Sequence, residues 1–356
     1  MESIPPLPPL PQDPLPIPLW RGVAIPVLAL VLIGGAFCIY LLSHHPATAP
    51  PSLYKGTITV GYTLWPGYVG LYVAKNKGYF AAEGLDVTLK EYPGFNELSQ
   101  AFIDGEIQMR ADLTIDAVEE AYRGFGQKVV IVIDHSNGSD GIISSEAIQS
   151  VDEFRGKRVA YEFGTLEEFF LSYALEQHDM TLAEIKSINL GSKEAAEAFV
   201  DGRADVAVTY EPYMSEALRT THGHVVYTSA DSPGLITDVI TVRNDFIDQH
   251  PETVAAFTQA YFDGLAFWLS HPDAANEITG TYLGISGEEV ATQLRGIDVL
   301  DKKDNQSAFT FAAGFESLYG NMRRLGDFIR GHRYPRAQKF NTDTLVDDSF
   351  IYTDFP

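Results

Sequence analysis

The chain has 356 residues, 45% of them hydrophobic, and a formal net charge of −23 at pH 7. This length is typical of about two domains, each able to bury a core without disulfides or metals. A surface this acidic repels nucleic acids and anionic lipids, which excludes a nucleic-acid-binding function. The only cysteine, Cys38, lies in an apolar run, so neither a disulfide framework nor a cysteine-based metal site is available.

Residues 1–53 form three segments that differ in composition from the rest. Residues 1–21 have eight prolines between positions 5 and 18, and we predict a disordered tail of polyproline II character. Residues 22–42 carry no charge, and a helix of this length just crosses a hydrocarbon core of about 30 Å. We therefore predict one transmembrane helix at 22–42 and a linker at 43–53.

Two other interpretations of the apolar segment stay open. A cleaved signal peptide usually has an apolar core of about 7 to 15 residues and a basic start, whereas Arg21 is the only basic residue in front of this one. A lipoprotein would be attached through Cys38, but Phe37 places a bulky ring where attachment signals have a small residue.

From Thr57 onward, apolar alternation and helical spacing predict alternating strands and helices. Such an order is typical of mainly parallel sheets with right-handed crossovers. The first half is predicted to hold strands at Thr57–Tyr62, Leu85–Glu91, Ile107–Ala111, Val129–Asp134 and Gly141–Ser145, and helices at Tyr68–Tyr79, Asn96–Asp104 and Ile115–Gly124.

The second half continues the same order. It is predicted to hold strands at Arg158–Tyr161, Glu184–Leu190, Asp205–Tyr210 and Val225–Ser229, and helices at Leu166–Gln177, Lys193–Asp201 and Pro212–Arg219. Thr165 and Glu168 have the spacing of a capping box. The rest is predicted to hold an extended run at Leu235–Val242, helices at 251–270, Gly287–Leu294 and Phe309–Gly331, and a peripheral acidic tail at Asp343–Pro356.

An internal repeat organises this part of the chain. The sequence AFIDG at 101–105 returns as AFVDG at 198–202, an offset of 97 residues that also maps Gly94 onto Gly191 and Glu97 onto Glu194. Asp112, Leu113 and Thr114 correspond in the same way to Thr209, Tyr210 and Glu211. Two copies of one α/β unit indicate two lobes with a cleft between them.

We predict that lobe 1 comprises residues 54–147 plus 235–356 and that lobe 2 comprises 148–234. The chain is expected to cross between them near Ser145–Val151 and again near Ser229–Thr237, which would make a hinge of two segments. In open α/β sheets, ligands bind at the carboxyl ends of the strands, so the cleft is the expected site.

Three strings carry a family resemblance: GYTLWPGYVGLYVAKNKGYFAAEGLDVTL at 61–89, SVDEFRGKRVAYEFGTLEEFFLSYAL at 150–175 and AFVDGRADVAVTYEPY at 198–213. The chain resembles the nitrate/sulfonate/taurine branch of ABC transporter substrate-binding proteins, which includes binders of thiamine-pyrimidine precursors. The resemblance implies a type II periplasmic-binding-protein fold, here preceded by one transmembrane helix. Tyr210 stands where the family usually has Trp, and the retained apolar segment is unusual for it.

The candidate ligand-binding residues follow the ends of predicted strands and the repeat. They are Trp65, Tyr68, Asp112, Thr114, Ser136, Asn137 and Asp140 from the first half, Glu162, Thr165, Tyr210 and Glu211 from the second, and Asp238 where the chain returns. The aromatic members offer flat faces, and Gly164 with Thr165 opens a helix whose N-terminus suits anion oxygens. Acidic candidates outnumber Arg110, which favours an amine or aminopyrimidine over nitrate.

The expected function is a membrane-anchored solute-binding protein that captures a sulfonate, amine or pyrimidine-like molecule by lobe closure and delivers it to an ABC permease and ATPase. With the helix predicted at 22–42 as its anchor, we expect an inner-membrane, single-pass monomer whose binding domain lies in the periplasm or outside the cell. No catalytic residue, cofactor or metal is expected. A ligand sensor and a pyrimidine-synthase-like enzyme stay open, although the synthases' clustered cysteine motif is absent here.

Overall fold

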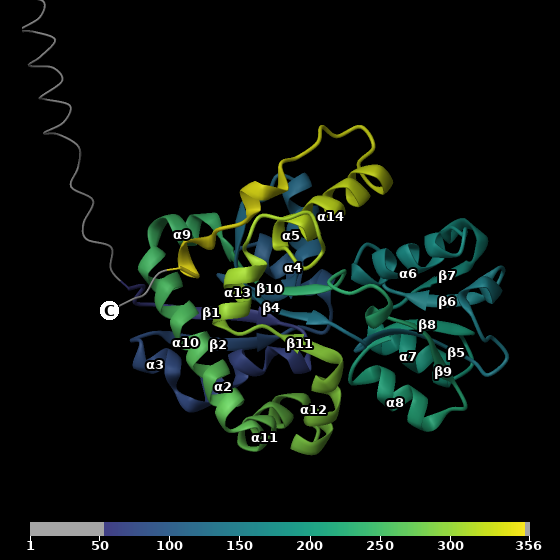
Figure 1. Ribbon diagram of the computed structural model, residues 1–356, viewed down its shortest axis with the longest axis horizontal. Coiled ribbons are helices and arrows are strands. Elements are labelled where there is room, and N and C mark those ends of the chain that lie inside the picture. Colours follow the sequence, from purple (N-terminus) through teal and green to yellow (C-terminus); the bar gives the residue numbers. More distant parts are fainter. Residues whose placement is uncertain (1–52, 353–356) are drawn as a thin grey trace, which may run out of the picture. The chain divides into compact units, whose positions relative to one another are not determined.

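The computed structural model describes residues 53–352, which form two α/β lobes (Figure 1). The predicted tail, transmembrane helix and most of the linker lie outside these residues. Among the described residues, no helix has both the length and the apolar character needed to span a bilayer.

Lobe 1 is built on a sheet of six strands, seen on the left of Figure 1. Strand β1 (Thr57–Tyr62) runs parallel to both β2 (Asp86–Glu91) and β3 (Met109–Leu113). Strand β10 (Thr237–Arg243) lies antiparallel between β3 and β4 (Gln127–Ser136), and β11 (Ile297–Val299) extends the edge beside β4.

Lobe 2 is built on a sheet of five strands in the order β7-β6-β8-β5-β9. Strand β6 (Arg158–Tyr161) runs parallel to β7 (Lys186–Asn189) and β8 (Val206–Tyr210). Strand β5 (Asp140–Ser144) lies antiparallel between β8 and β9 (His224–Thr228). In each sheet the strand that follows a crossing from the other lobe, β10 in lobe 1 and β5 in lobe 2, is antiparallel to both of its neighbours.

The first crossing lies earlier than predicted. Strand β5 pairs within the second sheet, so the chain changes lobes between Ser136 and Asp140 and not near Ser145–Val151. The polar loop after β4 contains Gly138 at φ 116°, a conformation that glycine adopts without strain, which lets the chain turn out of the first sheet there. The second crossing, before β10, agrees with the prediction.

The repeat is visible in the backbone. Helices α4 (Phe95–Ile103) and α7 (Ser192–Val200) differ by the 97-residue offset at both ends, as do β3 and β8. Each helix ends at an Asp-Gly pair whose glycine, Gly105 or Gly202, has a positive φ of 80° or 69°. Glycine tolerates this left-handed conformation, which explains why both copies keep it.

The helices of lobe 1 pack on its sheet and on one another, and α10 crosses α2 with Gly264 against the α2 backbone. Besides α4, they are α2 (Val69–Lys77), α3 (Tyr79–Ala82), α5 (Thr114–Tyr122), α9 (Asn244–Gln249), α10 (Pro251–Ser270), α11 (Pro272–Leu283), α12 (Gly287–Gln293), α13 (Lys302–Ala308) and α14 (Leu318–His332). Lobe 2 adds α6 (Leu166–Gln177) and α8 (Tyr213–Thr220) to α7.

Two predictions for the C-terminal part are wrong. Residues 309–317 are not helical, so the predicted helix begins only at Leu318, as α14, and α13 precedes the predicted range. The acidic tail is not peripheral as far as Tyr352, because Leu345, Phe350 and Ile351 are buried and Val346 bridges to Val129 of β4. These apolar residues inside the acidic run attach it to lobe 1.

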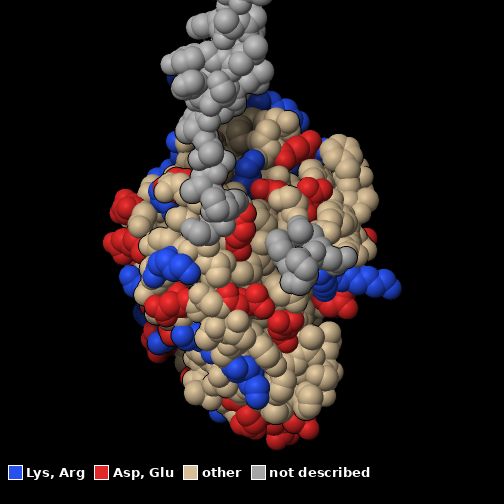
Figure 2. Space-filling view, turned by 90° about the vertical axis from the view of Figure 1, so that its left-hand side faces the viewer, with Lys and Arg blue, Asp and Glu red and all other residues tan. Residues whose placement is uncertain are grey.

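On the face shown in Figure 2, acidic side chains are interspersed with basic ones and do not form one patch. The main buried ionic group is Arg110, which is fully buried beneath the sheet ends of lobe 1. Its guanidinium pairs with Asp112 at 2.7 Å and Glu120 at 2.6 Å. Because both carboxylates surround it, this arginine is structural and is not free to meet a ligand.

Candidate functional site

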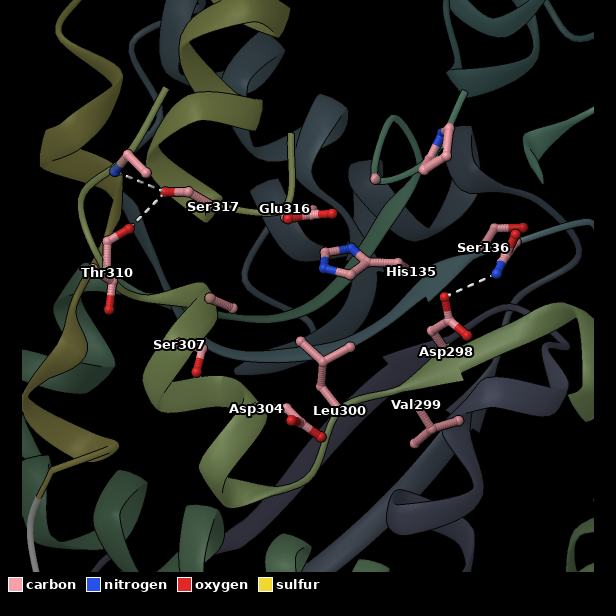
Figure 3. Close-up of a pocket in the computed structure, with 15 residues that line it drawn as sticks. His135, Ser136, Asp298, Val299, Leu300, Asp304, Ser307, Thr310, Glu316 and Ser317 are labelled. Carbon is pink, nitrogen blue, oxygen red and sulfur yellow. Dashed lines mark hydrogen bonds between the residues drawn. The ribbon is translucent and has the colours of Figure 1, made fainter. Parts of the chain in front are cut away.

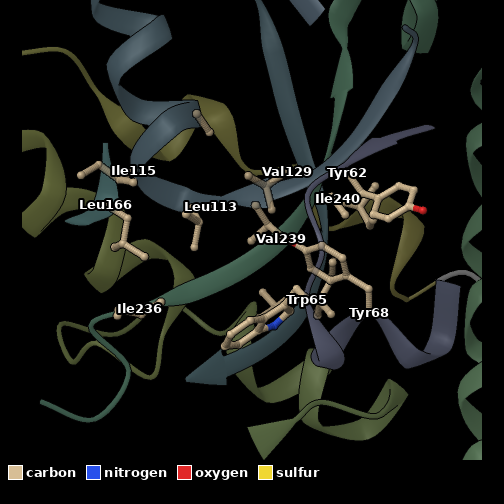
Figure 4. Close-up of a cluster of buried hydrophobic side chains, with 14 of the residues drawn as sticks. Tyr62, Trp65, Tyr68, Leu113, Ile115, Val129, Leu166, Ile236, Val239 and Ile240 are labelled. Carbon is tan, nitrogen blue, oxygen red and sulfur yellow. The ribbon is translucent and has the colours of Figure 1, made fainter. Parts of the chain in front are cut away.

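A small pocket lined by buried residues lies between the lobes, at the carboxyl ends of the strands. Its lining residues are Thr63, Trp65, Tyr68, Phe95, Leu113, Asp140, Leu166, Tyr210, Ile236 and Asp238, drawn from both lobes and the second crossing. The space open to the centre of a water molecule is about 10 Å³, roughly that of one water. Figure 4 shows Trp65, Tyr68, Leu113, Leu166 and Ile236 of this lining within the buried cluster.

Aromatic rings from the two lobes meet across the pocket. Tyr210 of lobe 2 makes an edge contact with Trp65 of lobe 1, with ring centroids 5.9 Å apart, and lies 6.1 Å from the ring of Phe95. All three rings are at least nine-tenths buried. A ligand placed here would be enclosed by flat apolar faces, and its contacts would span both lobes.

Two carboxyl groups behind the rings fix their orientation. The Trp65 indole N–H donates to Asp134 Oδ2 at 2.9 Å, and the Tyr68 hydroxyl donates to Asp238 Oδ1 at 2.8 Å. Asp134 and Asp238 are partners on the adjacent strands β4 and β10. A side chain at Gly67 would overlap Asp134 Oδ2, so glycine is required for this close approach.

Asp140, the first residue of β5, brings a carboxyl group from the crossing into the pocket. It is 6% exposed, its backbone N–H donates to the Ser136 hydroxyl at 3.2 Å, and its Oδ2 has no hydrogen-bond partner among the described residues. Burial raises the pKa of Asp140 to about 7, against a smaller opposing effect of Ser136. An unsatisfied buried acceptor of this kind favours a ligand that donates a hydrogen bond.

Glu162 joins the two copies of the repeat across the cleft. It accepts a hydrogen bond from the Asn96 side chain of α4, and its oxygens lie close to both Gly94 and Gly191, where α4 and α7 begin. Burial, followed by the charge of Glu167, raises the pKa of Glu162 to about 8. Its hydrogen bond to Asn96 thus ties lobe 2 to lobe 1.

The predicted capping box at α6 is not formed. Thr165 donates instead to the Glu162 carbonyl at 2.9 Å and to the Glu167 carboxylate, and the Gly164 N–H donates to Glu168 at 3.3 Å. Glu167 is 3% exposed and also accepts from Ser192. The chain's own carboxylates therefore occupy the helix start that suits anion oxygens.

Five of the twelve predicted site residues line the pocket: Trp65, Tyr68, Asp140, Tyr210 and Asp238. Three more do not line the pocket but bond near it: Ser136 accepts from the Asp140 N–H, Glu162 accepts from Asn96, and Thr165 donates to the Glu162 carbonyl. The remaining predicted residues are engaged elsewhere or lie outside the lining: Asp112 with Arg110, Glu211 with Ser215 at the start of α8, Asn137 with Asp298, and Thr114 buried as the first residue of α5.

A larger cavity of about 600 Å³ lies beside the crossings, on the lobe 1 side (Figure 3). It is lined by both crossing segments together with β11, α13 and the start of α14, and His135, Asp298 and Glu316 point toward it. The Asn137 side chain lies here. Lobe 2 residues do not line this cavity, so closure of the lobes would not enclose a molecule in it.

Several lining residues were missed by the sequence reasoning. Phe95, Leu113 and Leu166 are apolar and looked like ordinary core positions. Phe95 directly follows the repeat glycine Gly94, which is the signal that marks it as a cleft residue. Asp134 ends a predicted strand, and the strand-end rule applied to β4 as to β3 would have found it.

The lobes also meet at the end of α14. Arg333 donates to the Gly164 carbonyl at 3.1 Å and to Glu168 at 3.3 Å in lobe 2, and pairs with Glu119 in lobe 1. Phe328 packs on Phe169 with centroids 4.5 Å apart. Burial lowers the pKa of Arg333, although its charge stays paired. This contact, here called the clasp, holds the cleft loop at Gly164 against lobe 1.

The described residues include no group of three or more His, Cys, Asp or Glu side chains placed to hold a metal ion. The site instead combines enclosing aromatic rings with a few buried carboxyl groups. This arrangement can enclose and orient a small molecule.

The family model described as NMT1/THI5 like matches residues 65–275. The chain belongs to the NMT1/THI5-like family. Curated relatives include the riboflavin-binding protein RibY of Chloroflexus aurantiacus, 27% identical over 73% of this chain and 77% of that protein. A putative aliphatic sulfonates-binding protein of Bacillus subtilis is 26% identical over 65% of this chain and 72% of its own length. The predicted family resemblance is thus confirmed.

Solved structures show the fold of this NMT1/THI5-like chain. The alkanesulfonate-binding protein SsuA of Xanthomonas axonopodis pv. citri, bound to MOPS, superposes with a TM-score of 0.71 at 14% identity, covering 84% of this chain and all of that one. A Candida albicans protein described as having the generic periplasmic binding protein fold gives 0.63 at 13% identity, over 82% and 96%. The predicted two-lobed fold is confirmed for the described residues.

Proposed function

We propose that this protein captures a small organic molecule, such as a sulfonate, amine or pyrimidine-like compound, by closing its two lobes, and delivers it to an ABC permease and ATPase. The observation that carries the proposal is the pocket in which Trp65 of lobe 1 meets Tyr210 of lobe 2. Only a closed arrangement brings these rings together, so a ligand that contacts both would stabilise closure.

Relatives named as binding proteins favour binding over catalysis, and one relative is named as a synthase. The curated relatives include a taurine-binding periplasmic protein of Escherichia coli, 24% identical over 56% of this chain and 63% of that protein. A pyrimidine phosphate synthase of Candida albicans also matches, at 22% over 62% of this chain and 69% of that protein. The site itself offers aromatic rings and buried carboxyl groups, and the chain's only cysteine, Cys38, precedes the described residues.

We further propose that the helix at 22–42 anchors the protein in the inner membrane, with the two lobes in the periplasm or outside the cell. Its 21 uncharged residues support this proposal. The full chain should float with vesicles in a density gradient, and a variant without residues 22–42 should stay at the bottom. A full chain that remains soluble and free of vesicles would remove the anchor from the proposal.

Capture is tested by thermal shift of the purified full chain against sulfonates, amines, pyrimidines and carboxylates. A ligand at about 100 times its Kd should stabilise the native state by about 2.7 kcal/mol and raise Tm accordingly. On ligand addition, small-angle scattering should show that an open particle becomes more compact, or that a particle already closed keeps its dimensions. A bound compound that leaves the lobes open would contradict capture by closure.

Tyr210→Ala tests the pocket itself. Loss of one enclosing ring should weaken ligand binding by about tenfold or more in calorimetry. Tyr227→Ala is the matched control, because Tyr227 is similarly buried in the same sheet, at 9% against 6% exposed, but does not line the pocket. Equal affinity of Tyr210→Ala and wild type would remove this ring from the site.

A further inference from the structure

We infer that the pocket selects a planar ligand that carries positive charge or ring-bound N–H donors, such as an amidinium or an aminated heterocycle, and rejects sulfonates and carboxylates. This inference rests on the proposed capture of a small molecule and narrows its chemistry. It separates the chain from those relatives whose names specify sulfonates or taurine.

The first support is the unpartnered oxygen of Asp140. This carboxyl group is nine-tenths buried, lines the pocket, and leaves Oδ2 without a donor among the described residues. A buried acceptor in this state loses its hydration without compensation. A ligand N–H placed between the aromatic rings would supply the missing hydrogen bond, and a positive charge would strengthen it.

The second support is the lack of any positive group in the lining. None of the ten lining residues is basic, and two of them, Asp140 and Asp238, are acidic, with Asp134 directly behind. Arg110 lies in the same lobe, but Asp112 and Glu120 already hold its guanidinium. An anionic ligand would therefore meet buried carboxyl groups and find no counter-charge.

The third support is the start of α6, a twelve-residue helix whose N-terminus faces the cleft. Helix N-termini commonly receive anionic ligand groups. Here Glu168 accepts the Gly164 N–H at 3.3 Å, and buried Glu167 accepts the hydroxyls of Thr165 and Ser192. A sulfonate at this helix start would lie next to these two protein carboxylates, and their negative charge would oppose its binding.

The fourth support is the pair of aromatic rings that enclose the pocket. Trp65 and Tyr210 meet at an interplanar angle of 77°, and Asp134 holds the indole by its N–H. Aromatic faces attract cations by their negative electrostatic potential, so the same walls that enclose a flat ring also favour positive charge. Charge and shape therefore select the same class of ligand.

Proton release should accompany binding of a cation. Burial raises the pKa of Asp140 to about 7, so this carboxyl group is largely protonated in mildly acid solution. The ionisable groups that face it are Asp134 on β4, Asp238 on β10, Glu167 on α6, Tyr210 at the end of β8 and Glu211 directly after it. Because a cation prefers the ionised carboxylate, its affinity should rise between pH 6 and pH 8.

The test titrates the full chain with matched planar probes of opposite charge: benzamidine with benzoate, and 4-aminopyrimidine with pyrimidine-4-carboxylate. In each pair the positively charged or N–H-donating member should bind at least tenfold more tightly, with an affinity that increases with pH. Asp140→Asn should reduce this preference at least tenfold. Asp343→Asn is the control, since this carboxyl group pairs with Arg323 in lobe 1 and does not line the pocket, and it should change affinity less than twofold.

The inference is overturned if no such member binds more tightly than its anionic partner, or if Asp140→Asn keeps the wild-type preference. Small-angle scattering of the same samples separates this result from a failure of the proposed function. An anion that binds and closes the lobes leaves capture standing and refutes the charge selectivity. A probe that binds without closure refutes capture.

Discussion

Replacing Arg333 with Met should open the cleft while leaving each lobe folded. Arg333 links lobe 1 to the Gly164 carbonyl and to Glu168 in lobe 2, at 3.1 and 3.3 Å. Side-chain exposures of 14% for Arg333 and 22% for Glu168 leave some solvent screening, so we assign the inter-lobe part about 1–2 kcal/mol. Since 1.4 kcal/mol is a factor of ten, the closing equilibrium should shift by about 5- to 30-fold.

The matched control is Arg323→Met. Arg323 lies on the same helix and pairs with Asp343 at 2.7 Å, but both residues belong to lobe 1. Fluorophores on the two lobes would report the closed population by energy transfer, and calorimetry would report affinity for whichever probe binds. Arg333→Met should lower both the closed population and the affinity, whereas Arg323→Met should change neither by more than about twofold. Equal closure in Arg333→Met and wild type would refute the role of the clasp.

Three further predictions concern the buried groups of lobe 1 and the cleft. Arg110→Ala leaves Asp112 and Glu120 buried without their counter-charge, so the free energy of unfolding should fall by about 3–5 kcal/mol. Denaturant titration measures this change, and a loss below about 1 kcal/mol would contradict the structural role of the buried ion pairs. Gly67→Ala introduces a methyl group that overlaps Asp134 Oδ2 and lies 2.5 Å from Trp65 Nε1. Trp65 fluorescence should therefore shift, and ligand affinity should fall about tenfold. Gly331→Ala, with open space around the new methyl group, should change neither quantity. Burial raises the pKa of Glu162 to about 8, so the protonated Glu162 contributes its full stability below the unfolded pKa near 4.5 and loses it as the pH rises toward 8. The Tm of the wild type should fall over this pH range, and that of Glu162→Gln should fall less. Parallel Tm profiles would show that Glu162 is not the cause.

Local patterns predicted much of the fold because the relevant signals lie close together in the chain. Strands β1 and β6 and helix α6 have the predicted bounds, and the repeat fixed the equivalence of α4 with α7. Strand β3 begins two residues later than predicted, at Met109, because its register is set by pairing with β1 and β10. Such pairing across the sequence leaves no local trace.

The sequence predicted the candidate site only in part, for the same physical reason. The rings of Trp65, Tyr68 and Tyr210 follow strand ends, and the strand-end rule placed them at the cleft. Asp112 and Glu211 satisfy that rule equally well, yet each is held by a neighbour, Arg110 or Ser215, whose side-chain direction the sequence does not reveal. Sequence position indicates which residues reach the edge of a sheet, and packing decides which of them remain available to a ligand.

The exchange of reversed strands has a consequence for biosynthesis. Lobe 2 is formed by one continuous stretch, from β5 at Asp140 to β9 at Thr228, and can be completed as soon as that stretch leaves the ribosome. The sheet of lobe 1 instead lacks its inner strand until Thr237–Arg243 is made, because β10 separates β3 from β4. The N-terminal lobe must therefore wait with two open strand edges while its partner folds, which makes the nascent chain most vulnerable to aggregation before residue 243 emerges.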